Sequence, residues 1–130
     1  MNKSTPVKTE HGEIHGRNGI YLDEVVQSFG PSSLQFRGEI SRQQCTNTNI
    51  KKNWIGYILT FEGVEAFNCK ELSLYDETRI ISSFDELLES KWLSDLKLEG
   101  CYHYILATYD YVYEIAAKGH AFKSTGVDRD

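Results

Sequence analysis

The sequence lacks a continuous apolar segment long enough to cross a membrane. A membrane-spanning helix needs roughly 18 or more apolar residues, and no stretch of this chain approaches that length. The opening segment MNKSTPVKTEHGEIHG also has no apolar core of the kind found in a secretory signal. We therefore expect a cytoplasmic protein with no membrane partner.

Cysteine is sparse, and its three positions, Cys45, Cys69 and Cys101, form no CxxC pair. An odd number at wide spacing argues against a disulfide framework and against a zinc site. Cys69 and Cys101 lie in apolar runs and are expected to be buried, whereas Cys45 lies in a polar segment and is expected to be exposed. None has a flanking base that would indicate a catalytic thiol.

Recognisable phosphate loops and metal motifs are also missing. The ten glycines are scattered and form neither GxGxxG nor a GK[ST] loop. His11 and His15 are four residues apart and would share one face of a strand, but no third ligand follows at a recognisable spacing. A polar surface pair is the simpler interpretation, and we predict no metal and no cofactor.

Positive charge is scarce as well. The chain has 14 Lys and Arg against 19 Asp and Glu, a net charge of −5, and the excess lies in the middle third. Residues 62–99 contain ten acidic and four basic side chains. Because binding to a phosphate backbone needs a basic surface, nucleic acid is not the expected partner. The pattern favours a protein partner, and a basic one.

What is present is the composition of an ordinary folded domain. The chain has 130 residues, of which 40% are hydrophobic and 12% aromatic, and this length suits a single domain over 1–130. Polar residues at 1–10 predict a flexible arm, and those at 124–130 predict a frayed tail.

Several segments have the period-two alternation of strands. SLQFRGEIS alternates apolar and polar residues up to Ser41. Strands are also expected at about 54–61 and 64–74, joined in a hairpin by a tight Glu62-Gly63 turn, with a single bulged strand as the alternative. Another pair is expected at 102–109 and 111–117, with Asp110 as the turn residue. In such a hairpin, His103 shares one face of its strand with Ile105 and Ala107, and we expect it to be packed and not to act as a base.

Two segments are predicted to be helical. From 20 to 29, apolar residues fall at i, i+3, i+4 and i+7 before a Gly-Pro stop, and a strand is the alternative. At 84–96, an S-x-x-E capping box formed by Ser83 and Glu86 precedes an apolar stripe. The predicted fold class is α+β, with a mainly antiparallel sheet of five to six strands and one or two packed helices.

The candidate functional residues are acidic or aromatic. Residues 102–122 contain five of the eight tyrosines; tyrosine is a good strand former and is also enriched at binding hot spots. The predicted partner-binding residues are Glu62, Glu65, Glu71, Asp76, Glu77, Tyr75, Tyr109 and Tyr111. A small hydrolase or nuclease is the alternative; it would use His103 or His120 with Glu114, or a Glu114, Arg37 and His103 trio.

The run WIGYILTFEGVEAFNCKEL, followed by SSFDELLESKWLSDL and YHYILATYDYVYEIAA, resembles small bacterial proteins of unassigned function. Some relatives of that kind lie beside secreted toxins as immunity proteins. The resemblance implies a small, acidic, non-catalytic protein that covers a basic active site, and it carries over no functional residue.

These observations predict a non-catalytic protein-binding module, an immunity protein or antitoxin that neutralises a basic toxin through an acidic surface. A phage or mobile-element inhibitor of a host defence protein would use the same kind of surface and is a further alternative. The sequence does not determine the oligomeric state.

Overall fold

The computed structural model describes residues 3–46, 54–75 and 80–129 and consists mostly of β-strands. It contains a single α-helix and two short 3-10 helices in those ranges. The strands are β1 (Lys3–Pro6), β2 (Ile20–Phe29), β3 (Ser32–Ser41), β4 (Trp54–Glu62), β5 (Ala66–Glu71), β6 (Phe84–Leu88), β7 (Tyr102–Ala107), β8 (Tyr111–Ala117) and β9 (Gly119–Arg129); α1 is Lys91–Asp95, and the 3-10 helices are η1 (Arg42–Gln44) and η2 (Leu72–Leu74).

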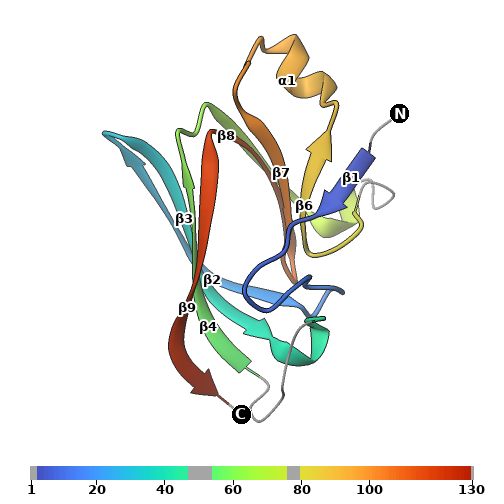
Figure 1. The fold of residues 1–130 in the computed structure, drawn as a ribbon, viewed down its shortest axis with the longest axis vertical. Helices are drawn as coiled ribbons and strands as arrows, with labels where there is room; N and C mark the ends of the chain where they lie inside the picture. Colours follow the sequence, from blue (N-terminus) through green and yellow to red (C-terminus); the bar gives the residue numbers. More distant parts are fainter. Residues whose placement is uncertain (1–2, 47–53, 76–79, 130) are drawn as a thin grey trace.

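The strands form two antiparallel sheets that face each other and diverge toward one end of the molecule (Figure 1). The five-stranded sheet has the order β1-β6-β7-β8-β5, and the four-stranded sheet has the order β2-β3-β4-β9. This architecture contradicts the α+β prediction: the protein is a mostly β structure with one short helix. No helix in the described part of the chain is long and apolar enough to cross a membrane.

The main core lies between the sheets. Its largest fully buried side chains include Tyr57, Phe36, Phe61 and Phe84. The ring of Phe36 packs edge-on against Tyr113, which joins β3 to β8. Burial raises the pKa of the Tyr57 hydroxyl well above its ordinary value, and this hydroxyl donates to the Tyr21 carbonyl at 3.3 Å.

A second, smaller core covers the outer face of the five-stranded sheet. It contains Tyr75, Leu87, Ile105, Ala107 and Val112, and it packs against Leu72 and Ile80. Alternation along β7 therefore buries both faces of this strand, with Tyr104 and Leu106 in the main core and Ile105 and Ala107 in the outer one.

The helix predicted at 20–29 is wrong and its strand alternative is confirmed, whereas the helix predicted at 84–96 is confirmed only over Lys91–Asp95. Residues 20–29 form β2, in which a bulge between Leu22 and Glu24 shifts the alternation by one residue. Leu22 pairs with Gly38 and Val25 pairs with Phe36, and these two partners lie on the same face of β3. The bulge therefore places Leu22 and Val25 on one face of the sheet although they are three residues apart.

Residues 84–88 form β6, which pairs with β1 on one side and β7 on the other. Only Lys91–Asp95 is α-helical, and its N-cap is Ser90, whose hydroxyl accepts from the Leu93 amide at 3.1 Å. Ser83, the predicted cap, instead donates its hydroxyl to the Gly16 carbonyl at 2.8 Å.

The strand predictions were more accurate than the helix predictions. The strand ending at Ser41 is confirmed as β3, and the pair around Asp110 is confirmed as the β7–β8 hairpin. Segments 54–61 and 64–74 do contain strands β4 and β5, and Gly63 has a φ of 63°. They do not form a hairpin, however, because β4 pairs with β3 and β9 while β5 pairs with β8 in the other sheet.

The two predicted mobile ends also contain strands. Lys3–Pro6, within the predicted arm, forms β1 and pairs with β6. The predicted tail at 124–130 contributes residues up to Arg129 to β9.

Candidate binding surface

Arg17 reaches the turn between β7 and β8 from the loop that precedes β2. Its Nε donates to the Tyr109 carbonyl at 2.9 Å, and its guanidinium carbon lies 4.3 Å from the centre of the Tyr109 ring. A cation over an aromatic face is attracted by the negative charge of that face. These two contacts fix the position of the guanidinium. Arg17 is exposed, so the guanidinium is held at the protein surface.

Tyr109 also stacks on a second aromatic ring. Tyr21 lies 5.0 Å from it with planes 17° apart, and Tyr21 meets Trp54 edge-to-face at 5.1 Å. We call Arg17, Tyr109, Tyr21 and Trp54 the aromatic ladder. Its members come from four different segments, and the three rings are half-buried, with one side open to solvent.

Backbone contacts hold the ladder in position. The Tyr109 amide donates to the Ile20 carbonyl at 3.0 Å, which ties the β7–β8 turn to the start of β2. Gly38 lets the backbone of Tyr21 approach β3, because a Cβ added at Gly38 would lie 1.9 Å from the Tyr21 oxygen. The ladder is thus pre-organised, and ordering it on binding would cost little.

Three adjoining hollows, with volumes of about 320, 360 and 300 Å³, are lined in part by Arg17, Tyr21 and Tyr109 of the ladder. The first and second share Arg17 and Leu72, and the second and third share Asp110 and Tyr111. We call the ladder and the residues of the second and third hollows the binding surface. Those two hollows are lined by Arg17, Tyr21, Leu22, Asp23, Glu24, Val25, Glu71, Leu72, Ser73, Thr108, Tyr109, Asp110, Tyr111 and Tyr113.

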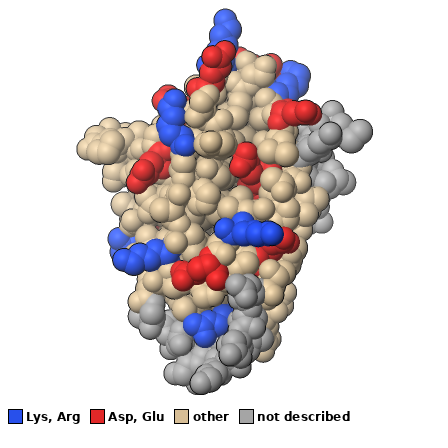
Figure 2. All heavy atoms as spheres, viewed as in Figure 1, with Lys and Arg blue, Asp and Glu red and all other residues tan. Residues whose placement is uncertain are grey.

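Charge on this surface is mainly negative. Four exposed carboxylates, Asp23, Glu24, Glu71 and Asp110, line the two hollows together with one cation, Arg17. Elsewhere the signs are mixed: Figure 2 shows acidic and basic side chains interspersed over the face seen in Figure 1. The binding surface therefore combines an acidic rim with the half-buried rings of the ladder and the exposed ring of Tyr111.

The structure brings together only some of the predicted site residues. Glu71, Tyr109 and Tyr111 lie on the binding surface. Glu62 and Glu65 are exposed at the opposite end of the five-stranded sheet, where the Glu65 amide donates to the Ala116 carbonyl near the end of β8. The eight predicted residues therefore do not form one continuous surface.

Tyr75 is buried and does not lie on the binding surface. Tyr75 was predicted to contact a partner, but only 8% of it is exposed and its hydroxyl is directed into the protein. Asp76 and Glu77 lie outside the described residues. Sequence reasoning also missed Arg17, Tyr21 and Trp54. No local pattern indicates that Arg17 and Tyr21 contact Tyr109, or that Tyr21 contacts Trp54, because these partners are far apart in the sequence.

The carboxylate and histidine of the enzymatic alternative do come together, in a buried polar cluster on the outer face of the five-stranded sheet. Glu114 Oε1 accepts from the Tyr75 hydroxyl at 2.6 Å and lies 3.5 Å from His103 Nε2. Asn68 Nδ2 donates to Glu114 Oε2 at 3.4 Å, and the Ser90 hydroxyl lies 2.6 Å from His103 Nδ1.

This buried polar cluster has little access to solvent. His103 is 1% exposed and Glu114 5%, and the Trp92 ring packs on the His103 ring at 4.8 Å. The Ser90 hydroxyl accepts from the Leu93 amide and lies within hydrogen-bond distance of His103 Nδ1, while His103 Nε2 faces Glu114. Each group thus has a structural role in joining α1 and the segment before β6 to the sheet.

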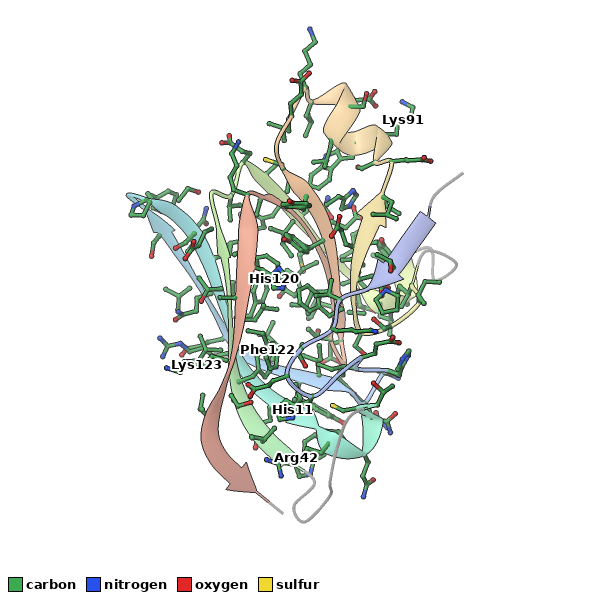
Figure 3. All side chains as sticks on the ribbon, in the orientation of Figure 1. His11, Arg42, Lys91, His120, Phe122 and Lys123 are labelled. Carbon is green, nitrogen blue, oxygen red and sulfur yellow. The ribbon has the colours of Figure 1, made fainter. Side chains whose placement is uncertain are left out.

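The other arrangements considered for catalysis are not formed. Arg37 lies in the four-stranded sheet, where it donates to Gln35 and lies 3.8 Å from Glu24, so the Glu114, Arg37 and His103 trio does not assemble. His120 points from β9 into the space between the sheets, as does Phe122 (Figure 3). His103 and His120 therefore lie on opposite faces of the five-stranded sheet.

Partial burial shifts the pKa values of His120 and Glu86, which lie between the two sheets. His120 Nδ1 lies 3.1 Å from the Tyr104 hydroxyl, and partial burial lowers the pKa of the histidine. Burial likewise raises the pKa of the Glu86 carboxyl, and burial together with the nearby Glu86 raises the pKa of Tyr104 to about 12. In each case the neutral form is favoured.

The burial of Cys45 and Cys69 differs from expectation, and His11 and His15 each bond to a polar side chain. Cys45 is buried and Cys69 is exposed, the reverse of the prediction, and burial raises the pKa of Cys45 to about 11. His11 bonds to the Ser124 hydroxyl at 2.7 Å, and His15 to Glu13 at 3.0 Å. Among the described residues, no group of three or more His, Cys, Asp or Glu side chains is placed to hold a metal ion.

Comparisons of the chain with protein-family models, with curated proteins and with solved structures found no significant match. Function must therefore be argued from the surface itself.

Proposed function

We propose that this protein is a non-catalytic, cytoplasmic protein-binding module, an immunity protein or antitoxin that covers a basic surface of a toxin. The observation that carries the proposal is the aromatic ladder with its acidic rim. Arg, Tyr and Trp are the residue types that most often dominate the free energy of binding at protein interfaces, and here they are stacked in advance at the protein surface.

The acidic rim supplies the second part of the proposal. Negative charge on one binding surface accelerates encounter with a positively charged partner and disfavours acidic ones. Four carboxylates against one cation give the two hollows this character. The same surface would serve an inhibitor of a host defence protein, and the identity of the captured partner distinguishes the two.

The enzymatic alternative has less support. His103 and Glu114 meet, but both are buried and are occupied by contacts within the protein. None of the three adjoining hollows is lined by either residue.

Affinity capture from the source cells tests the proposal with a matched pair of variants. Tyr111 is 45% exposed on the binding surface, and Tyr102 is 48% exposed at the opposite end of the five-stranded sheet. We expect wild type and Tyr102→Ala to retain the same basic protein, and Tyr111→Ala to lose at least roughly tenfold in affinity, as hot-spot truncations do. Equal affinities for the two variants would exclude this surface as the binding site.

A further inference from the structure

The second half of β2 is an exposed and unprotected sheet edge. β2 is the outermost strand of the four-stranded sheet, and every residue from Asp23 to Phe29 is exposed. No strand in the described part of the chain pairs with the outer side of β2. An edge of this kind is a template for pairing with another strand.

The two halves of β2 differ in how they discourage such pairing. The first half has a bulge between Leu22 and Glu24 and two carboxylates, Asp23 and Glu24, which are features that blunt an edge. The stretch Val25-Val26-Gln27-Ser28-Phe29 has no charge, no proline and a continuous register with β3. Val25 is 38% exposed, Val26 41% and Phe29 82%.

The other edges of the two sheets offer less. β1 has four residues and β5 has six, of which the last two, Lys70 and Glu71, are charged. β9 carries Lys123 in its exposed part. In Figure 1 the β2–β3 hairpin projects at the upper left beyond the rest of the molecule, and the tip of this projection has no charged side chain on the face that Figure 2 shows.

We propose that β2 pairs antiparallel with β2 of a second copy of this chain, across a two-fold axis at Gln27. This inference goes beyond the binding surface described above and does not depend on it. The pairing joins two four-stranded sheets into one sheet that continues through both copies, which is an isologous contact of the kind found in symmetric dimers.

The register follows from side-chain and charge matching. With Gln27 opposite its own copy, Phe29 of each chain lies opposite Val25 of the other, and aromatic residues paired with β-branched ones stabilise antiparallel strands. Shifting the axis to Val26 would instead place Phe29 opposite Asp23, and shifting it to Ser28 would place Val25 opposite Pro31. Only the Gln27 axis matches the five uncharged residues with themselves.

Analytical ultracentrifugation of charge variants at Gln27 tests both the dimer and its register. Wild type is expected to form dimers as concentration rises. Lys or Glu at this position would face an identical charge on the axis, so Gln27→Lys and Gln27→Glu should each weaken dimerisation roughly tenfold or more. An equimolar mixture of the two variants should restore dimers, because opposite charges then meet.

Control variants separate this edge from others. Thr125 is exposed on β9, the opposite edge of the same sheet, so Thr125→Lys and Thr125→Glu should dimerise like wild type. The proposal is overturned if wild type stays monomeric at all concentrations, if the Gln27 variants dimerise normally, or if their mixture fails to form heterodimers while circular dichroism shows both to be folded.

Discussion

Replacing Tyr75 with phenylalanine removes one hydroxyl from the buried polar cluster and leaves the ring in place. That hydroxyl donates to Glu114 Oε1 at 2.6 Å in a site where Glu114 is 5% exposed and His103 1%. Hydrogen bonds to charged groups contribute about 1.5–3 kcal/mol, and the loss is felt most where water cannot replace the missing partner. We expect Tyr75→Phe to reduce the free energy of unfolding by about 2 kcal/mol.

Urea denaturation followed by circular dichroism measures this loss, with Tyr111→Phe as the matched control. Tyr111 is 45% exposed, so losing its hydroxyl should change stability by less than about 0.5 kcal/mol. A double-mutant cycle with Glu114→Gln adds a second readout. Removing the carboxylate charge should cost less in the Tyr75→Phe background than in wild type, because the contact is already gone.

Two results would refute this reasoning. A Tyr75→Phe variant as stable as Tyr111→Phe would mean that the hydroxyl contributes nothing to the folded state. Strict additivity of Tyr75→Phe and Glu114→Gln would mean that the two groups are not coupled, and the structural role assigned to the buried polar cluster would fail.

The remaining predictions concern packing, pH and thiol reactivity. Gly38→Ala should cost about 1–3 kcal/mol and alter tryptophan fluorescence, because its Cβ would lie 1.9 Å from the Tyr21 oxygen; unchanged stability and fluorescence would contradict this. Burial lowers the pKa of His120 in the folded state, so its contribution is full above the ordinary histidine pKa and is lost as pH falls below it. Wild type should thus lose more stability between roughly pH 7.5 and pH 5.5 than His120→Gln, by less than about 1 kcal/mol given the partial exposure of the ring. A thiol reagent should modify Cys69 much faster than Cys45, which is buried with a pKa raised to about 11; equal rates would contradict the assigned burial.

Local patterns in the sequence predicted those strands whose alternation is uninterrupted. β3 and the β7–β8 hairpin follow from period-two spacing and from the turn at Asp110. At β2, by contrast, the extra residue of a bulge produced the i, i+3 spacing of a helix. At β6, both faces are buried, so apolar residues occur on both sides and imitate a helical stripe.

Pairing between distant strands was beyond the reach of local patterns. Gly63 does supply a positive φ between β4 and β5, but whether the next strand turns back or crosses to the other sheet depends on which edges are already paired. β4 has β3 and β9 on its two sides, so β5 joins β8.

The candidate site, like the fold, could be predicted from the sequence only in part. Of the residues predicted from the neighbouring acidic and tyrosine-rich segments, Glu71, Tyr109 and Tyr111 lie together. Sequence reasoning could not separate Glu62 and Glu65, which lie at the far end of the sheet, nor bring Arg17, Tyr21 and Trp54 to the β7–β8 turn. The Tyr21–Tyr109 contact joins the β7–β8 turn to the other sheet, and the Tyr21–Trp54 contact joins two strands that are separated by β3 in the four-stranded sheet.

The rate of association with the captured partner, measured by stopped flow as a function of salt, tests the central claim most directly. Glu71→Lys/Asp110→Lys reverses two charges on the binding surface, and Glu62→Lys/Glu65→Lys makes the same change in net charge at the opposite end of the five-stranded sheet. We expect the first variant to associate at least roughly fivefold more slowly at low salt, with a weaker dependence on salt. The second should remain close to wild type. Equal slowing of both variants would show that only overall charge matters, and unchanged association of the first would contradict the assigned surface.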